Sequence, residues 1–185
     1  LEEKGEEERY IFGFEESCGY LTGGYARDKD AIDASLLLVE MASAYKLAGK
    51  TLVDVLEEIY SRHGIYRNAV ESLAFEGANG MAKMDAIMAG LRANPLTEIA
   101  GERVTVRLDY ASSVEEDLVA GTIKTISLPS SNVLEYRLEN GCAVIIRPSG
   151  TEPKIKIYYS LMAETSHQVG ALERRYKAAG GSLVQ

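Results

Sequence analysis

The pattern of hydrophobic and polar positions predicts a strand, a loop and a helix near the start of the chain. Residues 10–14 are mostly apolar and predict a short strand, and residues 15–30 predict a glycine-rich loop. Residues 31–48 are hydrophobic at almost every position around a helix, which predicts a buried helix rather than a surface one. Asp30 precedes this run, with Asp33 three residues later, so we expect Asp30 to be the helix N-cap.

Short polar signals divide the rest of this first region. Gly49 is expected to end the helix. Thr51 and Asp54, three residues apart, resemble a capping box for a second helix that ends near residue 64. The charged residues 2–9 predict the end of an earlier helix.

The second region alternates strands and turns, with a helix near each end. Asn140–Gly141 between two alternating runs predicts a β-hairpin. Methionines and leucines in 81–91 repeat with helical spacing, and core packing is the expected role of these methionines. The predicted strands are 69–75, 104–108, 134–138, 142–147 and 155–161, and the predicted helices are 81–93 and 164–179. This order predicts an α+β domain whose antiparallel sheet is covered by helices on one face.

The two patterns together predict two domains. Residues 1–65 are expected to be the C-terminal part of a mixed α/β domain, and residues 66–185 an α+β domain with an antiparallel sheet covered by helices. The boundary is expected within residues 64–68. A chain of 185 residues is long enough to bury a core in one or two domains.

Charge and cysteine content narrow the class of partner. The net charge of −8 argues against general attraction to nucleic acid or to an anionic membrane. An anion would therefore need a local cationic site. No apolar run is long enough to span a bilayer, and Cys18 and Cys142 form neither a disulfide framework nor a C-x-x-C metal pattern. We expect a reducing, cytoplasmic setting.

A polar loop between the two last predicted strands is the most informative stretch. It reads R-P-S-G-T-E-P-K over residues 147–154. Arg147 can donate two parallel hydrogen bonds, Ser149 and Thr151 add hydroxyl donors, and Gly150 lets backbone amides turn inward. Converging donors of this kind suit a phosphate dianion. The structural alternative is an ordinary turn with a solvated arginine.

A second loop follows the first predicted strand. Glu15 and Glu16 stand beside Ser17, and carboxylates and hydroxyls are the groups that recognise sugar hydroxyls. The run R-D-K-D over residues 27–30 places cations beside the start of a helix. The structural alternatives are a solvated pair of glutamates and a charged helix start. No metal site is predicted, because the remaining ligands of an EF-hand loop are absent around Asp28 and Asp30.

These motifs together resemble those of one enzyme family. The segments G-F-E-E-S-C-G-Y, R-D-K-D and R-P-S-G-T-E-P-K-I-K-I-Y are similar to the C-terminal part of an α-D-phosphohexomutase, closest to the phosphoglucomutase and phosphopentomutase branch. The resemblance covers essentially the whole chain. The motif R-P-S-G-T-E-P is highly specific, and E-E-S-x-G is moderately so.

The resemblance implies a four-domain enzyme in which a phosphoserine of the first domain donates its phosphoryl group to a sugar phosphate. A sugar bisphosphate intermediate then turns over and returns its other phosphoryl group. Mg²⁺ would be held by an aspartate-rich loop of the second domain. The third domain would contact sugar hydroxyls, and the fourth would bind the phosphate that does not react.

Carried residue by residue, the resemblance implies a role for each matched position. The sugar contacts would be Glu15 and Ser17, and Lys29 would be a candidate active-site cation near the transferred phosphoryl group. The distal phosphate would be bound by Arg147, Ser149, Gly150 and Thr151. Lys156 stands where many relatives have an arginine, and lysine supplies charge without a bidentate fork.

Two family motifs, the serine loop T-A-S-H-N-P and the metal loop D-G-D-G-D-R, are absent from this chain. The first strand and most of the first helix of the third domain would precede Leu1. We therefore expect this chain alone to transfer no phosphoryl group and to need the N-terminal domains of its parent. The favoured substrate is glucose phosphate. Ribose or deoxyribose phosphate, a non-catalytic phosphosugar-binding module and a purely structural domain are the alternatives.

Overall fold

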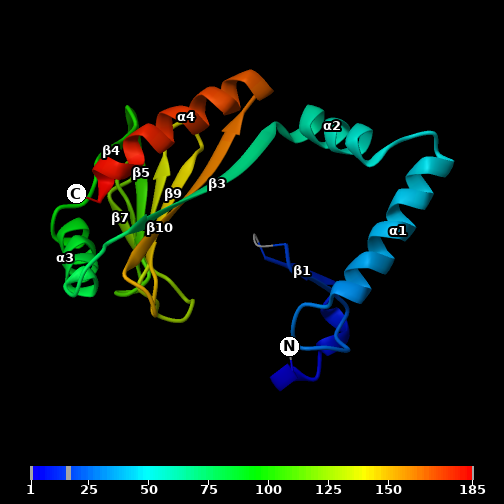
Figure 1. Ribbon diagram of the computed structural model, residues 1–185, viewed down its shortest axis with the longest axis horizontal. Helices are drawn as coiled ribbons and strands as arrows, with labels where there is room; N and C mark the ends of the chain where they lie inside the picture. The colour runs from blue at the N-terminus through cyan, green and yellow to red at the C-terminus, as the bar shows by residue number, and fades with distance from the viewer. Residues whose placement is uncertain (1, 16–17, 185) are drawn as a thin grey trace. The chain divides into compact units, whose positions relative to one another are not determined.

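The computed structural model describes residues 2–15 and 18–184 and divides into two compact units. The N-terminal unit is Leu1–Ile59 and the C-terminal unit is Tyr60–Gln185 (Figure 1). The two units are defined by contacts within the chain. The domain ranges 1–65 and 66–185 remain a prediction.

The N-terminal unit contains a two-stranded ribbon and helices. Its elements are the 3-10 helices η1 (Glu2–Lys4) and η2 (Glu7–Arg9), strands β1 (Phe12–Phe14) and β2 (Tyr20–Thr22), and helices α1 (Ala31–Leu47) and α2 (Leu52–His63), the last of which continues into the C-terminal unit. The predicted end of an α-helix over residues 2–9 is wrong, because this segment forms two isolated 3-10 turns. Strand β2 was not predicted; it pairs antiparallel with β1 inside the expected loop.

The predicted start of α1 is confirmed. The carboxylate of Asp30 accepts hydrogen bonds from the amides of Ile32, at 2.8 Å, and Asp33, at 3.2 Å. Asp33 in turn accepts from the amide and the hydroxyl of Thr22, both at 2.6 Å, which joins α1 to β2. The two bonds to Asp30 satisfy amide donors that a helix start leaves without a partner.

The end of α1 and the start of α2 are also as predicted. Gly49 follows α1 with a φ of +74°, in the left-handed region where a glycine is favoured. The amide of Thr51 donates to the carboxylate of Asp54 at 2.7 Å, and the amide of Asp54 donates to the hydroxyl of Thr51 at 3.2 Å. The reciprocal pair is a capping box at the start of α2.

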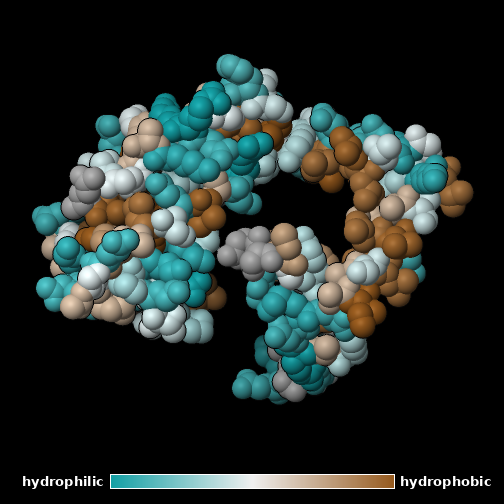
Figure 2. Space-filling model, in the orientation of Figure 1, coloured by the Kyte–Doolittle hydropathy of each residue, from teal (hydrophilic) through white to brown (hydrophobic). Residues whose placement is uncertain are grey.

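The prediction that α1 is buried is wrong. None of its residues is buried, and Leu36 and Val39 are 60% and 62% exposed. Figure 2 shows the hydrophobic surface that this leaves along α1. The hydrophobic run predicted a covered helix, but within its own unit α1 packs mainly against the short strand β2. One three-residue strand is too small to cover a helix on all sides.

The C-terminal unit is built on an antiparallel sheet. Its strands are β3 (Ile65–Ala74), β4 (Glu98–Ile99), β5 (Glu102–Asp109), β6 (Val114–Asp117), β7 (Thr122–Thr125), β8 (Leu134–Leu138), β9 (Ala143–Pro148) and β10 (Lys154–Ala163). The strand order is β3-β10-β9-β8-β5-β6-β7, with β4 paired to β5. The helices are α3 (Gly80–Ala93) and α4 (Ser166–Leu183).

Helices α3 and α4 cover one face of this sheet, as predicted, and Figure 1 shows α4 lying along β10 and β3. Alternate residues of β10 are fully buried in the resulting core, among them Ile155, Ile157 and Tyr159. The opposite residues of β10 lie on the uncovered face. Two methionines of α3, Met84 and Met88, are part of the core, as expected from their spacing.

Strand β5 departs from its predicted alternation. The pairing between β5 and β8 shifts between Val104 and Val106, which is a β-bulge. Val104 pairs with Leu138 and belongs to the core under the helices, whereas Leu108 pairs with Glu135 on the opposite face. The alternation of hydrophobic residues in the sequence could not show this change of face. A bulge inserts one residue into the strand, so the residues after it point to the opposite side of the sheet.

Several element bounds also differ from the predictions. Strand β3 begins at Ile65 rather than at residue 69, because its first residues pair with the end of β10. Strands β4, β6 and β7 were not predicted, and α4 continues to Leu183. None of the helices in the described part of the chain has the length and hydrophobicity needed to cross a membrane.

Candidate functional site

The predicted phosphate loop connects β9 to β10 in the C-terminal unit. The two strands pair up to Pro148 and Ile155, so the loop closes a hairpin. The amide of Ser149 donates to the carbonyl of Lys154 at 2.9 Å. The amide of Phe75 donates to the carbonyl of Pro153 at 2.8 Å, which ties the loop to the end of β3. The loop is therefore supported by three neighbouring strands.

Arg147 and Lys156 face each other at the base of this loop. They are direct cross-strand partners in the β9–β10 pairing, and their side chains lie on the same face of the sheet. Both alternate with core residues, so this face is the one that the helices leave uncovered. Within the described residues, neither cation has a hydrogen bond or an ion pair with a carboxylate. Two unneutralised cations placed opposite each other are destabilising unless an anion lies between them.

The loop itself offers further donors. The hydroxyl of Ser149 accepts long hydrogen bonds from the amides of Thr151, at 3.4 Å, and Glu152, at 3.3 Å. Its own proton can be donated to a ligand. Gly150 does not adopt a left-handed conformation, and a Cβ at this position would meet no atom within 4 Å. Gly150 therefore leaves open space beside the loop, while Ser149 organises the amides of Thr151 and Glu152.

Lys154, at the far end of the loop, differs from the other two cations. Its ammonium forms an ion pair with the carboxylate of Glu152. The unpaired positive charge of this hairpin is therefore that of Arg147 and Lys156.

The predicted sugar loop connects β1 to β2 in the N-terminal unit. The amide of Glu15 donates to the carbonyl of Gly19 at 2.8 Å, which closes the turn. Cys18 has a φ of +64°, an unusual conformation for a residue other than glycine. Ser17, predicted to contact the sugar, lies outside the described residues.

Lys29 joins this loop to the start of α1. Its ammonium lies 3.1 Å from Oε1 of Glu15 and 2.7 Å from Oδ1 of Asp28. Hydrogen bonds to Asp28 and then to Glu15 raise the pKa of Lys29 above its ordinary value. The hydrogen bond from Lys29 lowers the pKa of Asp28. Lys29 is therefore a cation over the whole physiological pH range, and it lies beside the predicted sugar ligand Glu15.

A cavity of about 680 Å³ lies next to this ion pair, between the β1–β2 ribbon and the first half of α1. Lys29 and Gly19 contribute to its wall, together with apolar residues of the ribbon and the helix. The cavity is lined by Phe12, Cys18, Gly19, Tyr20, Lys29, Ala31, Ala34, Ser35, Leu37, Leu38 and Met41. Lys29 is the charged residue of this lining, so a polar ligand in the cavity would meet its ammonium.

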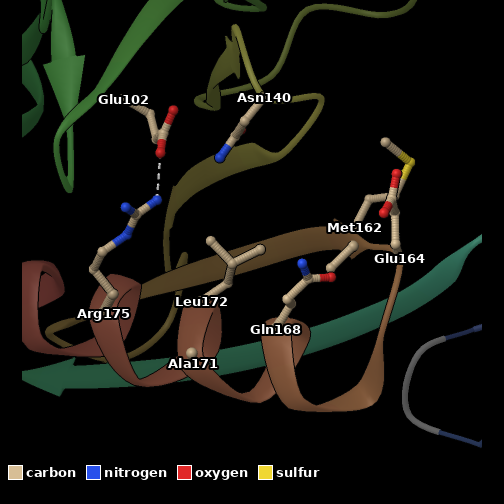
Figure 3. Close-up of a pocket in the computed structure, with 9 residues that line it drawn as sticks. Glu102, Asn140, Met162, Glu164, Gln168, Ala171, Leu172 and Arg175 are labelled. Atoms are coloured by element: carbon tan, nitrogen blue, oxygen red, sulfur yellow. Dashed lines mark hydrogen bonds and ion pairs between the residues drawn. The ribbon is translucent and has the colours of Figure 1, made fainter.

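A groove at the other end of the C-terminal unit has different chemistry (Figure 3). It has a volume of about 470 Å³ and lies beside α4, next to the end of β10 that is opposite the phosphate loop. The guanidinium of Arg175 points to Glu102 and is hydrogen-bonded to it. Because this cation is already neutralised, the groove is a poor anion site.

Metal ligands do not gather in the described chain. No group of three or more His, Cys, Asp and Glu side chains among residues 2–15 and 18–184 is arranged to hold a metal ion.

Comparison with protein families identifies the family of this chain. The family model described as phosphoglucomutase/phosphomannomutase, alpha/beta/alpha domain III, matches residues 1–63. The model for the C-terminal domain of the same family matches residues 76–161. The first match includes the β1–β2 loop and Lys29, and the second includes the β9–β10 loop. The chain belongs to the phosphohexomutase family.

Its relatives show which part of a phosphohexomutase this chain represents. It is 44% identical over 151 residues to a phosphoglucomutase of Staphylococcus aureus, covering 82% of this chain and 27% of the relative. It is 40% identical over 169 residues to a phosphoglucomutase of Staphylococcus haemolyticus, covering 91% of this chain and 31% of the relative. The chain thus spans under a third of these relatives and corresponds to their C-terminal domains.

A solved structure agrees on the fold. The chain is similar, with a TM-score of 0.53 and 17% identity, to a crystal structure of the exocytosis-sensitive phosphoprotein pp63/parafusin, a phosphoglucomutase from Paramecium in its open form. The match covers 86% of this chain and 28% of that structure. It supports the α/β and α+β architecture predicted for this chain.

Two residues beside the predicted site were not identified from the sequence. Asp28 was considered as part of a charged run and as a rejected metal ligand, yet it makes the shorter of the two Lys29 contacts. Gly19 was part of a motif, but its contact with Lys29 depends on the fold. No local pattern shows that a side chain ten residues later crosses a glycine.

Proposed function

We propose that this chain is the substrate-binding portion of a phosphoglucomutase that interconverts glucose 1-phosphate and glucose 6-phosphate. Supporting this function are the two phosphohexomutase domain matches and relatives that are phosphoglucomutases. The observation that carries the binding role is the facing pair Arg147 and Lys156, which has no carboxylate partner in the described chain.

The phosphate end of the proposal follows from charge and hydrogen bonding. Arg147 can bind two phosphate oxygens in a fork, and Lys156 adds a point charge from the neighbouring strand. Ser149, Gly150 and Thr151 supply hydroxyls and amides above this pair. Such a site recognises a phosphate without regard to the carbon that carries it.

The sugar end of the proposal is the β1–β2 loop. The carboxylate of Glu15 can accept hydrogen bonds from sugar hydroxyls, and Ser17 is the predicted second contact. Lys29, held between Glu15 and Asp28, is the proposed supporting cation for the transferred phosphoryl group. A small group that both donates and accepts can bind the sugar in either of two orientations.

These properties suit a reaction through a phosphoserine enzyme and a sugar bisphosphate, in which each phosphate is bound in turn at the distal site. In the proposal, the phosphoserine and Mg²⁺ belong to other domains of the parent protein. When bound there, Mg²⁺ would supply electrostatic stabilisation of the phosphoryl group. The residues of this chain bind and orient the substrate, and the chain alone is expected to be inactive. We also propose that the parent protein is cytoplasmic.

The proposal is tested by titrating the chain with glucose 1-phosphate and, separately, inorganic phosphate, while amide chemical shifts are recorded by NMR. We expect both ligands to shift Ser149, Gly150 and Thr151, and only the sugar phosphate to shift Glu15 and Gly19. Arg147→Ala should weaken inorganic phosphate binding by about tenfold or more, since a hydrogen bond to a charged group contributes about 1.5–3 kcal/mol.

The matched control is Arg174→Ala, which removes the same charge from an exposed position on α4. It should leave phosphate affinity within about twofold, because long-range charge effects are screened at physiological salt. Equal loss of affinity in both variants, or no shifts at the β9–β10 loop, would contradict the phosphate site. Turnover of glucose 1-phosphate by this chain with Mg²⁺ would contradict the expected inactivity.

A further inference from the structure

The side chain of Lys29 crosses directly over Gly19. A Cβ atom built on Gly19 would overlap Cδ of Lys29 and would lie 2.8 Å from its Cγ and 3.1 Å from its Cε. Real Cβ atoms do not approach a neighbour this closely, and the overlapped atoms are in the middle of the lysine stem. A side chain at position 19 would therefore require Lys29 to take another path.

Gly19 does not need to be a glycine for its backbone conformation. Its φ is not in the left-handed region, whereas the preceding residue, Cys18, has a φ of +64°. An alanine could adopt the backbone of Gly19 without the strain that a positive φ imposes. What Gly19 contributes is the space left by its missing side chain.

The backbone on both sides of this contact is held in place. The amide of Glu15 donates to the carbonyl of Gly19 at 2.8 Å, and the amide of Asp30 donates to the carbonyl of Tyr20 at 2.9 Å. Lys29 therefore starts beside β2, and its route to Glu15 passes over Gly19. At the end of this route the ammonium lies 3.1 Å from the Glu15 carboxylate.

We propose that Gly19 is a positioning residue of the sugar site, which acts by leaving room for Lys29 to reach Glu15. This inference rests on the proposed function for the roles of Lys29 and Glu15 toward substrate. The position of Lys29 itself does not depend on that function. A methyl group at position 19 forces the stem of Lys29 off this route and so moves its ammonium away from Glu15.

The test is Gly19→Ala in this chain, with the titration of the Lys29 ammonium followed by NMR of labelled lysine. We expect its pKa to fall toward the ordinary value of about 10.4, because the hydrogen bond to Glu15 is lost. In Gly19→Ala, a several-fold higher concentration of glucose 1-phosphate should be needed to shift the amide of Glu15. Inorganic phosphate binding at the β9–β10 loop should not change.

A double-mutant cycle separates this role from a general effect on the loop. In a Lys29→Ala background, Gly19→Ala should have no further effect on binding of glucose 1-phosphate, because the overlapping stem is gone. Additive effects of the two substitutions would overturn the proposal. The control Gly24→Ala changes a glycine of the same ribbon region whose Cβ would contact Glu7 rather than Lys29. It should leave the Lys29 pKa unchanged.

A second measurement applies if Gly19→Ala disturbs the fold of the ribbon. The double variant Gly19→Ala/Lys29→Ala removes the overlap and should restore the native amide shifts of β1 and β2. Failure to restore them would contradict the proposal. If glucose 1-phosphate does not bind the unchanged chain, a fall in the Lys29 pKa on Gly19→Ala still supports the positioning. An unchanged pKa overturns it whether or not the sugar binds.

Discussion

The two units of this chain have similar local signals but very different cores. In the C-terminal unit, residues of the sheet, α3 and α4 form one buried cluster. In the described part of the N-terminal unit, Leu21 is the only buried hydrophobic residue, although α1 is the most continuously hydrophobic helix of the chain. Good caps and hydrophobic composition therefore specify where a helix begins and ends, but burial depends on what packs against it.

The largest expected difference between the units is the response to truncating a large hydrophobic side chain. Ile157 is fully buried in the centre of β10, so Ile157→Ala should lower the free energy of unfolding of the C-terminal unit by about 2–5 kcal/mol. Leu38 on α1 is 52% exposed, so Leu38→Ala should lower the free energy of unfolding by less than about 0.5 kcal/mol. Urea unfolding followed by circular dichroism measures both. Comparable losses would mean that α1 is packed in solution.

An intermediate effect distinguishes packing from helix propensity within α4. A Cβ at Gly180 would overlap the hydroxyl of Tyr159 and the carboxylate of Glu71, which are hydrogen-bonded at 2.9 Å, whereas a Cβ at Gly181 would meet nothing within 4 Å. Gly180→Ala should therefore destabilise the C-terminal unit by about 1–3 kcal/mol, and Gly181→Ala should stabilise it by about 0.5–1 kcal/mol. Thermal unfolding of the two variants gives the sign. Stabilisation by both would show that α4 does not pack tightly at Gly180.

The smallest effects come from the helix caps, which should act alike in the two units. Thr165 forms a capping box with Gln168 at the start of α4, and Asp30 caps α1. Thr165→Ala should cost about 0.5–2 kcal/mol of domain stability, and Asp30→Ala should weaken the first turn of α1. The measurement is urea unfolding for α4, and Cα chemical shifts of residues 31–34 for the less packed α1. Unchanged shifts in Asp30→Ala would contradict the capping of α1.

The two caps should differ in their response to pH. Hydrogen bonds from Tyr25 and from the amides of Asp33 and Ile32 lower the pKa of Asp30 in the folded chain. Because the folded pKa lies below the unfolded value of about 3.9, charged Asp30 stabilises α1 fully above that value. This contribution is lost as the pH falls through the lower folded pKa. The same Cα shifts, recorded between pH 6 and pH 2, should show this loss. Asp30→Asn should remove the part of the pH dependence that comes from the Asp30 carboxylate. The Thr165 cap has no such dependence.

The candidate site repeats the difference between the units. Arg147 and Lys156 lie on paired strands that are anchored by the core, so their separation is set by the β9–β10 register. Glu15 and Lys29 lie on a short ribbon and a helix start, and their contact depends on Gly19 and on an exposed ion pair. We therefore expect the phosphate end to be formed before ligand binding. The sugar end should respond more strongly to substitution and pH.

The sequence alone determined the features that depend on neighbouring residues. The sequence predicted the caps at Asp30 and Thr51, the hairpin at Asn140–Gly141 and the strands β8 and β10, because each depends on residues within one turn or one strand. The R-P-S-G-T motif and the family were also readable, since the motif residues are contiguous.

Only the tertiary structure decided features that depend on distant partners. The exposure of α1, the change of face at the β5 bulge and the strand order could not be read from hydrophobic periodicity, because each depends on which surface packs against it. The pairing of Arg147 with Lys156 follows from hairpin register, and the passage of Lys29 over Gly19 follows from backbone hydrogen bonds between segments ten residues apart. Local composition specifies the chemical groups, and the packing of separate segments places them against one another.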